Sequence, residues 1–334
     1  VLYYALNFRS PKLCSITFRQ QILRLIQEDM SRLSLQELLL LMMCQANCNK
    51  LSLFQECLRQ VKSRSKEFIQ LAREKGPDVM VNFFYAYVVS QIPGHVRKNT
   101  RGIEPDIVKE ATEFLDLFLE ELIPNVNKLS VSGLYRLSYA LEHSHISNVY
   151  ELYRRIELRL MKELDTYDPI LQVEFIRVMS HISGKRSGAS SAFWERVGKM
   201  ITEKGAKFES YHAPILLQAL ASSSAATKET NAVLIPLCKK YLEKFTPNYT
   251  GLKTLMQGVM FANIKDEGLI LSIVKTFSKM PYYAPAKYYS TFAQFRLHSE
   301  ALFPDWTYTY YDNRCYHGKS EFIPFRGITP TQEK

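Results

Sequence analysis

The stretch LSYALEHSHISNVYELYRRIELRLMKE, residues 137–163, decides the fold of this chain. Apolar residues recur every three or four positions in its first and last parts, and the polar run HSHISN separates them. This periodicity predicts two amphipathic helices joined by a short loop. The second helix carries three basic residues at helical spacing, which are Arg155, Arg159 and Lys162. They belong either to one charged surface helix or to one unit of a repeat.

The same pattern of helix, loop and helix recurs along the chain. When four first helices are aligned, small or medium apolar residues fall in register at nearly equal steps: Ala140, Val178, Ala219 and Gly258. Large residues of the second helices follow at equal steps: Tyr153, Trp194 and Ile235. Helix pairs of about forty residues bury their apolar faces only by stacking on their neighbours. The repeats therefore predict an all-α fold, an α-solenoid.

The predicted organisation has three parts. Residues 1–30 form a lead helix or extension, and residues 31–280 form about six stacked helical hairpins. Residues 281–334 form a terminal capping helix followed by an irregular aromatic tail.

Capping residues predict where several helices begin. Ser34 with Glu37, and Ser52 with Gln55, match the capping box, in which two side chains satisfy N–H groups of the first turn. The Asp168-Pro169 dipeptide places a cap before a proline at the first helical position. These signals support the helix starts independently of apolar periodicity.

Composition agrees with a mostly helical protein. The chain has 334 residues, of which 46% are hydrophobic and 13 are glycine, so it can bury a large core. Its six cysteines are scattered, mostly through apolar helical patterns. Such cysteines behave as small hydrophobic residues in a reducing compartment. No apolar run reaches the length of a transmembrane helix.

The charge of the chain points to an anionic partner. The formal net charge is +10 and the isoelectric point is about 9.2, and the usual partner of such basic proteins is nucleic acid or an acidic surface. Residues 1–27 contain four basic residues and no acidic residue, a bias shared with mitochondrial targeting segments. These residues are either an ordinary amphipathic helix or part of such a segment, and the second alternative leads us to expect a mitochondrial location.

The units between residues 129 and 279 resemble the degenerate helical-hairpin repeats of organellar RNA proteins, the octotricopeptide and heptatricopeptide repeat group. The resemblance lies in repeat length and apolar register, covers about half to two thirds of the chain and includes no invariant motif. It implies an α-solenoid that associates with mitochondrial RNA. Some members of the group add a C-terminal RAP domain, which residues 281–334 do not resemble.

Four basic residues recur at equal steps near the ends of successive second helices: Arg159, Lys199, Lys239 and Lys279. In a regular solenoid they would form one line of positive charge that follows RNA phosphates. Other basic residues widen this basic ladder: Arg155, Lys162 and Lys240 beside it, and Lys185 and Arg186 in the loop SGKRSG. The alternative is a solvated charged face, because acidic residues one helical turn away partly neutralise the row.

Motifs for catalysis or metal binding do not occur in the sequence. It contains no P-loop, dinucleotide-binding, nucleophile-elbow or HExxH pattern. His143 and His145 lack further ligands at metal spacing, and Cys44 and Cys48 lack a second pair. We therefore expect no enzyme activity, no metal and no cofactor. A helix over residues 104–121 carries seven acidic residues and one lysine, and we expect it to repel RNA.

The C-terminal tail is aromatic rather than polar, whereas disordered tails contain few aromatic residues. We expect the tail to cap the last repeat or to bind another subunit. The residues predicted to make this contact are Trp306, Tyr308, Tyr310, Phe322 and Phe325.

Two functions remain open at this point. The first is a non-catalytic, RNA-associated helical-repeat protein of a mitochondrial ribonucleoprotein, most concretely a mitochondrial ribosome subunit or an RNA-processing factor. Its partners would be rRNA or another organellar RNA, together with protein subunits of the assembly. The second is a structural scaffold subunit of a large mitochondrial complex, such as a respiratory or ATP synthase assembly, with protein contacts only. A continuous basic face favours the first function, and evenly spread charge with apolar patches favours the second.

Overall fold

The computed structural model divides the chain into two compact units. They comprise residues 1–160 and 161–334, and the boundary between them lies within helix α9 (Tyr150–Glu163). The described residues are 24, 30–48, 51–91, 113, 116, 118–143, 150–183, 189–245, 248–278, 289–304, 306–310 and 325–330. The boundary falls inside residues 31–280, which the sequence predicts as one repeat domain.

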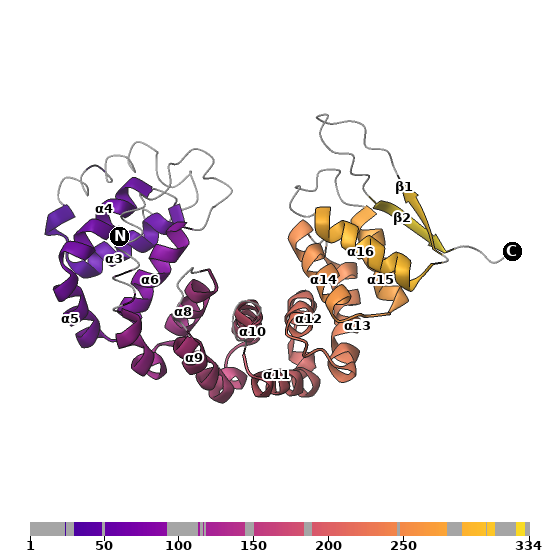
Figure 1. Ribbon diagram of the computed structural model, residues 1–334, viewed down its shortest axis with the longest axis horizontal. Coiled ribbons are helices and arrows are strands. Elements are labelled where there is room, and N and C mark those ends of the chain that lie inside the picture. Colours follow the sequence, from indigo (N-terminus) through magenta and orange to yellow (C-terminus); the bar gives the residue numbers. More distant parts are fainter. Residues whose placement is uncertain are drawn as a thin grey trace. The chain divides into compact units, whose positions relative to one another are not determined.

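Helices make up nearly all of the described chain (Figure 1). From the N-terminus to the boundary they are η1 (Met30–Arg32), α3 (Leu35–Cys48), α4 (Leu51–Ser63), α5 (Ser65–Lys75), α6 (Asp78–Gln91), η2 (Ile123–Lys128), α8 (Val131–His143) and α9. After α9 come η3 (Leu164–Thr166), α10 (Pro169–Ser183), α11 (Ser191–Lys204), η4 (Gly205–Lys207), η5 (Ser210–His212), α12 (Ala213–Ser222), α13 (Lys228–Lys244), α14 (Tyr249–Phe261), α15 (Glu267–Ser278) and α16 (Tyr289–Leu302). The prediction of a helical protein is confirmed.

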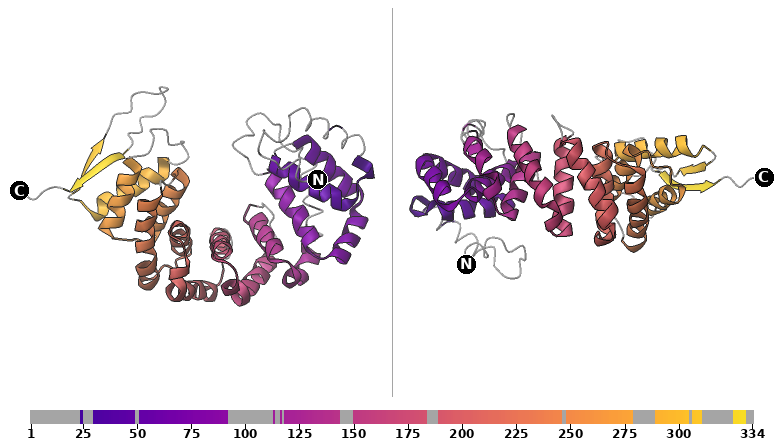
Figure 2. Two further views of the ribbon diagram at one scale, coloured as in Figure 1. Left: turned by 180° about the vertical axis from the view of Figure 1, so that it is seen from behind. Right: turned by 90° about the horizontal axis from the view of Figure 1, so that it is seen from below.

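The tail contains a short sheet where the sequence predicts irregular structure. Strand β1 (Trp306–Tyr310) pairs antiparallel with β2 (Phe325–Pro330), and the pairing runs from Trp306 opposite Pro330 to Tyr310 opposite Phe325. The two strands lie side by side in every view (Figure 2). Threonine and aromatic residues in β1 favour extended backbone, so the prediction of irregular structure was wrong for these two segments.

The core of the first unit is built on aromatic rings. Helix α3 packs against α4 and α6, and α6 also contacts α5 and α8. The ring centroids of Phe68, Phe83 and Phe118 lie 4.9 to 5.5 Å from one another. All three side chains are almost fully buried, and tilted or edge-on rings at these separations attract one another. This contact holds together segments that are far apart in the sequence.

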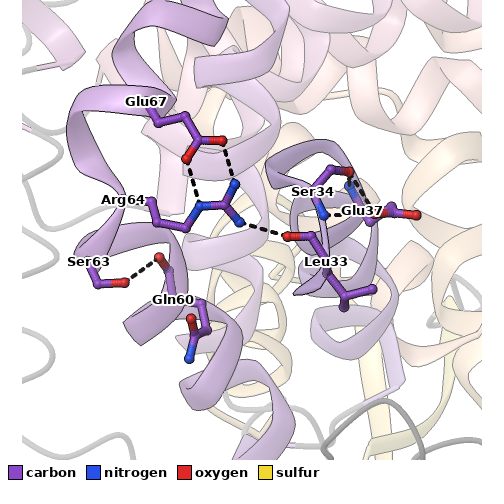
Figure 3. A network of polar contacts seen from close by, with 7 residues as sticks. All are labelled: Leu33, Ser34, Glu37, Gln60, Ser63, Arg64 and Glu67. Atoms are coloured by element: carbon purple, nitrogen blue, oxygen red, sulfur yellow. Dashed lines mark hydrogen bonds and ion pairs between the residues drawn. The ribbon is translucent and has the colours of Figure 1, made fainter. Parts of the chain in front are cut away.

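A polar network fixes the start of α3 (Figure 3). Ser34 and Glu37 form the predicted capping box: the Ser34 hydroxyl accepts from the Glu37 N–H at 3.3 Å, and the Glu37 carboxylate accepts from the Ser34 N–H at 2.8 Å. Arg64, at the junction of α4 and α5, donates to the Leu33 carbonyl at 2.7 Å and pairs with Glu67. The network therefore ties the beginning of α3 to the helices that follow it.

In the second unit the helices alternate between two rows. Helices α10, α12, α14 and α16 are successive neighbours in one row, and α11, α13 and α15 are successive neighbours in the other (Figure 1). Strand β2 lies against α15. From α10 to α14, each helix therefore contacts the helix two positions further along the chain.

Capping side chains recur at the starts of three first helices. The Ser130 hydroxyl, the Asp168 carboxylate and the Asn248 amide oxygen accept first-turn N–H groups at 3.0, 3.0 and 2.8 Å. Each cap lies ten residues before one of the aligned residues, which are Ala140, Val178 and Gly258. The alignment of the first helices therefore agrees with their observed starts. The cap predicted at Ser52 is wrong, because α4 begins at Leu51.

The ends of α12 and α14 share one turn geometry. The Ala225 N–H donates to the Leu220 carbonyl at 2.8 Å, and one repeat later the Ile264 N–H donates to the Val259 carbonyl at 3.0 Å. Ser224 and Asn263 precede these donors and adopt positive φ angles of 53° and 49°. This is the Schellman arrangement that closes a helix C-terminus. The turns after α12 and α14 are therefore structurally equivalent.

Gly258 is small because two helices approach closely there. A Cβ atom on this residue would lie 3.0 Å from the Gln218 backbone nitrogen and 3.0 Å from the Leu217 Cγ atom, both on α12. Ala219 is also buried. The small residues that the sequence alignment places in register therefore include a contact point between α12 and α14.

A buried histidine predicts acid sensitivity of the second unit. His212 is 4% exposed, and neither of its ring nitrogens has a hydrogen-bond partner. Burial lowers the pKa of His212 below its usual value, and Glu209 and Glu174 offset only part of this effect. Below a pH of about 6.5 the unfolded chain takes up the proton more readily than the folded chain. The free energy of unfolding therefore decreases as the pH is lowered.

We expect a His212→Gln variant to lose less stability than the wild type between pH 7.5 and pH 5.5. Urea denaturation at both pH values measures the difference, and carboxylates common to both proteins cancel in the comparison. An equal loss of stability in the two proteins would show that His212 does not titrate differently on folding.

Candidate nucleic-acid interface

Arg159, the first residue of the predicted basic ladder, is buried in the first unit. Its side chain is 7% exposed and donates to the carbonyls of Val126 and Leu129 at 2.9 and 2.8 Å. These carbonyls belong to the end of η2, where the Val126 carbonyl also accepts the Leu129 N–H at 3.2 Å. The structure therefore corrects the prediction that Arg159 faces RNA, because its guanidinium closes a helix end instead.

The reason for this difference is the true register of the second helices. Three positions are buried in α9, α11 and α13 alike, and each recurs at a step one residue longer than that of the basic ladder: Leu152, Phe193 and Leu234; Ile156, Val197 and Cys238; Arg159, Met200 and Tyr241. Relative to the buried positions, the basic ladder therefore shifts by one residue from each second helix to the next. One residue rotates a side chain by about 100° around a helix, so Arg159, Lys199 and Lys239 each lie at a different angle to the buried positions of their own helix.

Lys199 and Lys239, both in the second unit, differ in their surroundings. The Lys199 side chain is 74% exposed and lies 3.7 Å from Glu203 on its own helix. Lys239 is half-buried, and its Nζ lies 2.8 Å from Asp266. Burial opposes ionisation of Asp266, but hydrogen bonds from Lys239 and from the Leu269 N–H outweigh it and lower the Asp266 pKa. Lys239 therefore stabilises the start of α15.

The remaining basic residues of the ladder have mixed surroundings. Arg155 pairs with Glu151 at 2.8 Å, and Lys162 and Lys240 are exposed. Lys185, Arg186 and Lys279 lie outside the described residues. Those predicted cations that the structure describes therefore differ in burial and in pairing within each unit. In the predicted acidic helix, Glu113, Asp116 and Glu120 are exposed, and Glu121 pairs with Arg73.

Three tyrosines and one histidine gather on the accessible side of α6 and α8 in the first unit. The ring centroids of Tyr85 and Tyr139 are 5.7 Å apart, and Tyr139 lies 6.3 Å from Tyr135 and 4.6 Å from His143. The acidic side chain beside this group, Glu142, is buried and lies 3.7 Å from His143 Nε2. All four rings are half-buried. We call these four residues the tyrosine face.

A guanidinium group and an amide adjoin the tyrosine face. Arg136, one turn before Tyr139 on α8, donates to the Asn82 Oδ1 atom at 2.5 Å, and Asn82 lies one turn before Tyr85 on α6. Partial burial raises the pKa of the Tyr85 hydroxyl, although Arg136 offsets part of the effect. Its ring therefore stays uncharged at neutral pH. Neutral aromatic rings beside a cation are the groups that stack on bases and attract phosphates in proteins that bind single-stranded nucleic acid.

The sequence contains a signal for this face that the alignment missed. Tyr139 immediately precedes the aligned residue Ala140, and Tyr85 immediately precedes Ala86, which is equally buried. The step from Tyr85 to Tyr139 is longer than the repeat, because residues 92–117 intervene. A search for repeats of about forty residues therefore aligned α8 with later helices but not with α6.

The same register position in the second unit carries polar side chains. Arg177, Gln218 and Gln257 each immediately precede an aligned residue. The Gln218 side chain donates to the Gln257 Oε1 atom at 2.7 Å, from α12 to α14. Arg177 pairs with Glu174 at 3.0 Å on its own helix. This position thus presents hydrogen-bonding groups in the second unit and aromatic groups in the first.

The predicted partner-binding residues are divided between the two strands. Trp306, Tyr308 and Tyr310 belong to β1, and Phe325 begins β2. Phe322 lies outside the described residues. Because β2 lies against α15, the sheet adjoins the last helices of the second unit.

Reactive groups are few in the part of the chain that the structure describes. No three His, Cys, Asp or Glu side chains there are grouped as metal ligands. Cys57 and Cys238 are free and fully buried. Burial raises the pKa of Cys57 to about 12 and raises that of Cys238 further, so both thiols stay protonated at neutral pH. No described helix is long and apolar enough to cross a bilayer.

No model of a known protein family matches this chain, and no curated protein sequence matches it.

Proposed function

We propose that this chain is a non-catalytic, RNA-associated α-solenoid of a mitochondrial ribonucleoprotein, most concretely a mitochondrial ribosome subunit or an RNA-processing factor. The observation that carries the RNA proposal is the tyrosine face beside Arg136, with Tyr85 and Tyr139 at 5.7 Å. Single-stranded RNA offers flat bases and phosphates to such a surface. The net charge of +10 favours the same class of partner.

The solenoid part of the proposal rests on recurring local structure. Caps ten residues before the aligned residues, and two equivalent turns one repeat apart, support stacked hairpins. We extend this arrangement to about six hairpins between residues 31 and 280. The mitochondrial location rests on the four basic residues and the lack of acidic residues in residues 1–27.

The second candidate function is a scaffold subunit of a large mitochondrial complex, with protein contacts only. Exposed apolar side chains in the second unit favour it: Ile170, Tyr211 and Phe245 are 58%, 41% and 43% exposed. The rings of Tyr211 and Phe245 lie 6.2 Å apart. Exposed apolar groups of this kind suit a protein interface. The ion pairs of Lys239 with Asp266 and of Arg196 with Asp165 also reduce the charge available for RNA.

Binding of a fluorescent single-stranded RNA at increasing salt distinguishes the two functions. We expect measurable affinity at about 50 mM salt and a log–log slope of about 0.7 for each phosphate neutralised. A duplex RNA of equal length should bind more weakly, because its bases cannot stack on tyrosine rings. Equal affinity for the two RNAs would contradict base stacking, and no binding of either RNA would favour the scaffold.

A further inference from the structure

A groove lies on the second helices of the second unit. It has a volume of about 490 Å³ and lies between the accessible side of α11 and the turn that joins α12 to α13. Trp194 and Gly198 of α11 form one wall, and Ala225, Thr227 and Thr230 form part of the other. These elements all belong to one unit, because α11 packs on α13.

The next hairpin fills the equivalent space with its own side chains. In the register of the buried positions, Lys239 of α13 stands where α11 has Gly198. When the turns after α12 and α14 are aligned, each residue that lines the groove has a counterpart in the next hairpin. These pairs are Ala225 and Ile264, Thr227 and Asp266, and Thr230 and Leu269. Ile264 and Leu269 are buried, and the Lys239 ammonium lies 2.8 Å from Asp266. The groove exists because Gly198, Ala225 and Thr230 are smaller than their counterparts.

The charges at the groove favour a cationic occupant. Glu195 and Glu229 are exposed carboxylates among its lining residues, and Glu229 stands where the next hairpin has Gly268. A hydrogen bond from its own backbone, and another from Thr227, lower the pKa of Glu229. Lys199 also lines the groove but lies near Glu203 on its own helix. Compared with the next hairpin, the groove thus has Gly198 in place of the cation Lys239. It also has the Glu229 carboxylate in place of Gly268, which lies beside Lys239 in the next hairpin.

We propose that this groove binds a lysine or arginine side chain presented by a partner protein, together with a neighbouring apolar side chain. The cationic group lies where Lys239 lies in the next hairpin and contacts Glu229, while the apolar group replaces Ile264. The two carboxylates repel phosphates, so the occupant is a basic protein segment and not RNA. The site is separate from the tyrosine face, and it does not depend on RNA binding.

Tryptophan fluorescence measures binding at this groove in the full chain. The chain has two tryptophans, so a Trp306→Phe variant leaves Trp194 as the only tryptophan. Two blocked heptapeptides serve as probes: one with Arg beside Leu at its centre, and one with Gln in place of Arg. We expect the Arg peptide to change the Trp194 emission and to bind about tenfold more tightly than the Gln peptide, because a charged hydrogen bond is lost.

Two changes in the groove test the proposal independently. Glu229→Gln should weaken the Arg peptide about tenfold, whereas Lys199→Gln should not weaken it. The double change Gly198→Lys and Thr227→Asp builds the pair seen between Lys239 and Asp266, so it should abolish peptide binding while the protein keeps its melting temperature. Equal affinity for both peptides, no effect of Glu229→Gln, or a Trp194 response to single-stranded RNA instead would overturn the proposal. If the double variant does not fold, Glu229→Gln and the peptide pair still decide the matter.

Discussion

Replacing Arg159 by methionine should lower the free energy of unfolding by about 2 to 5 kcal/mol. The side chain donates to two carbonyls, those of Val126 and Leu129, in a buried site. Methionine fills the space of the aliphatic stem, as Met200 does at the equivalent position of α11, but it offers no donor. The Val126 carbonyl would keep the Leu129 N–H as its donor, but both carbonyls would lose a hydrogen bond from a charged group, and each such bond contributes about 1.5 to 3 kcal/mol.

Urea denaturation followed by circular dichroism measures this loss. The matched control is Lys199→Met, which removes an exposed cation from α11 and should change stability by at most about 0.5 kcal/mol. RNA affinity of the folded Arg159→Met protein should equal that of the wild type. Full stability of Arg159→Met with reduced RNA affinity would return Arg159 to the RNA-binding surface.

Replacing Tyr85 and Tyr139 together by leucine should weaken single-stranded RNA binding by about 30-fold, which corresponds to about 2 kcal/mol. The expectation depends on the proposed function, and its physical reason is the loss of two rings on which bases stack. Leucine retains apolar bulk at these half-buried positions, so the fold should persist. Fluorescence anisotropy with a labelled single-stranded RNA measures the change in affinity, and circular dichroism checks the fold.

Phenylalanine at the same two positions is the matched control, because it keeps the rings and removes only the hydroxyls. This variant should bind RNA within about threefold of the wild type. Arg136→Gln should instead flatten the salt dependence by about 0.7, the value for one phosphate contact. If the leucine variant binds RNA as tightly as the wild type, the tyrosine face does not contact bases.

Much of the helical architecture follows from local sequence signals. The Ser34 capping box, the cap at Asp168 and the step from Val178 to Gly258 all correspond to observed structure. A cap depends on hydrogen bonds between residues two or three positions apart, so a short stretch of sequence contains all of its parts. A small residue among large ones likewise marks close helix contact.

The candidate sites depend on contacts that the sequence does not display. The sequence alone predicts that Arg159 is an exposed basic residue. In the structure its guanidinium donates to carbonyls about thirty positions earlier in the chain. Tyr85 and Tyr139 come together across a step longer than the repeat. The groove beside Gly198 is formed by residues of α11 and of the turn between α12 and α13. The side chains that fill the equivalent space in the next hairpin include the Lys239–Asp266 pair.

The sequence by itself determined the helical class, several helix starts and the small residues where helices approach. The step between Tyr153, Trp194 and Ile235 is also one residue longer than that of the basic ladder. Only the tertiary structure showed that this longer step sets the buried side of each second helix, so that the basic ladder does not keep to one side. The physical reason is angular: an error of one residue in a forty-residue step hardly alters the apparent repeat, but it turns a side chain by about 100°. Packing of neighbouring helices selects one of these orientations, and it placed Arg159 in the core and left Lys199 in solvent.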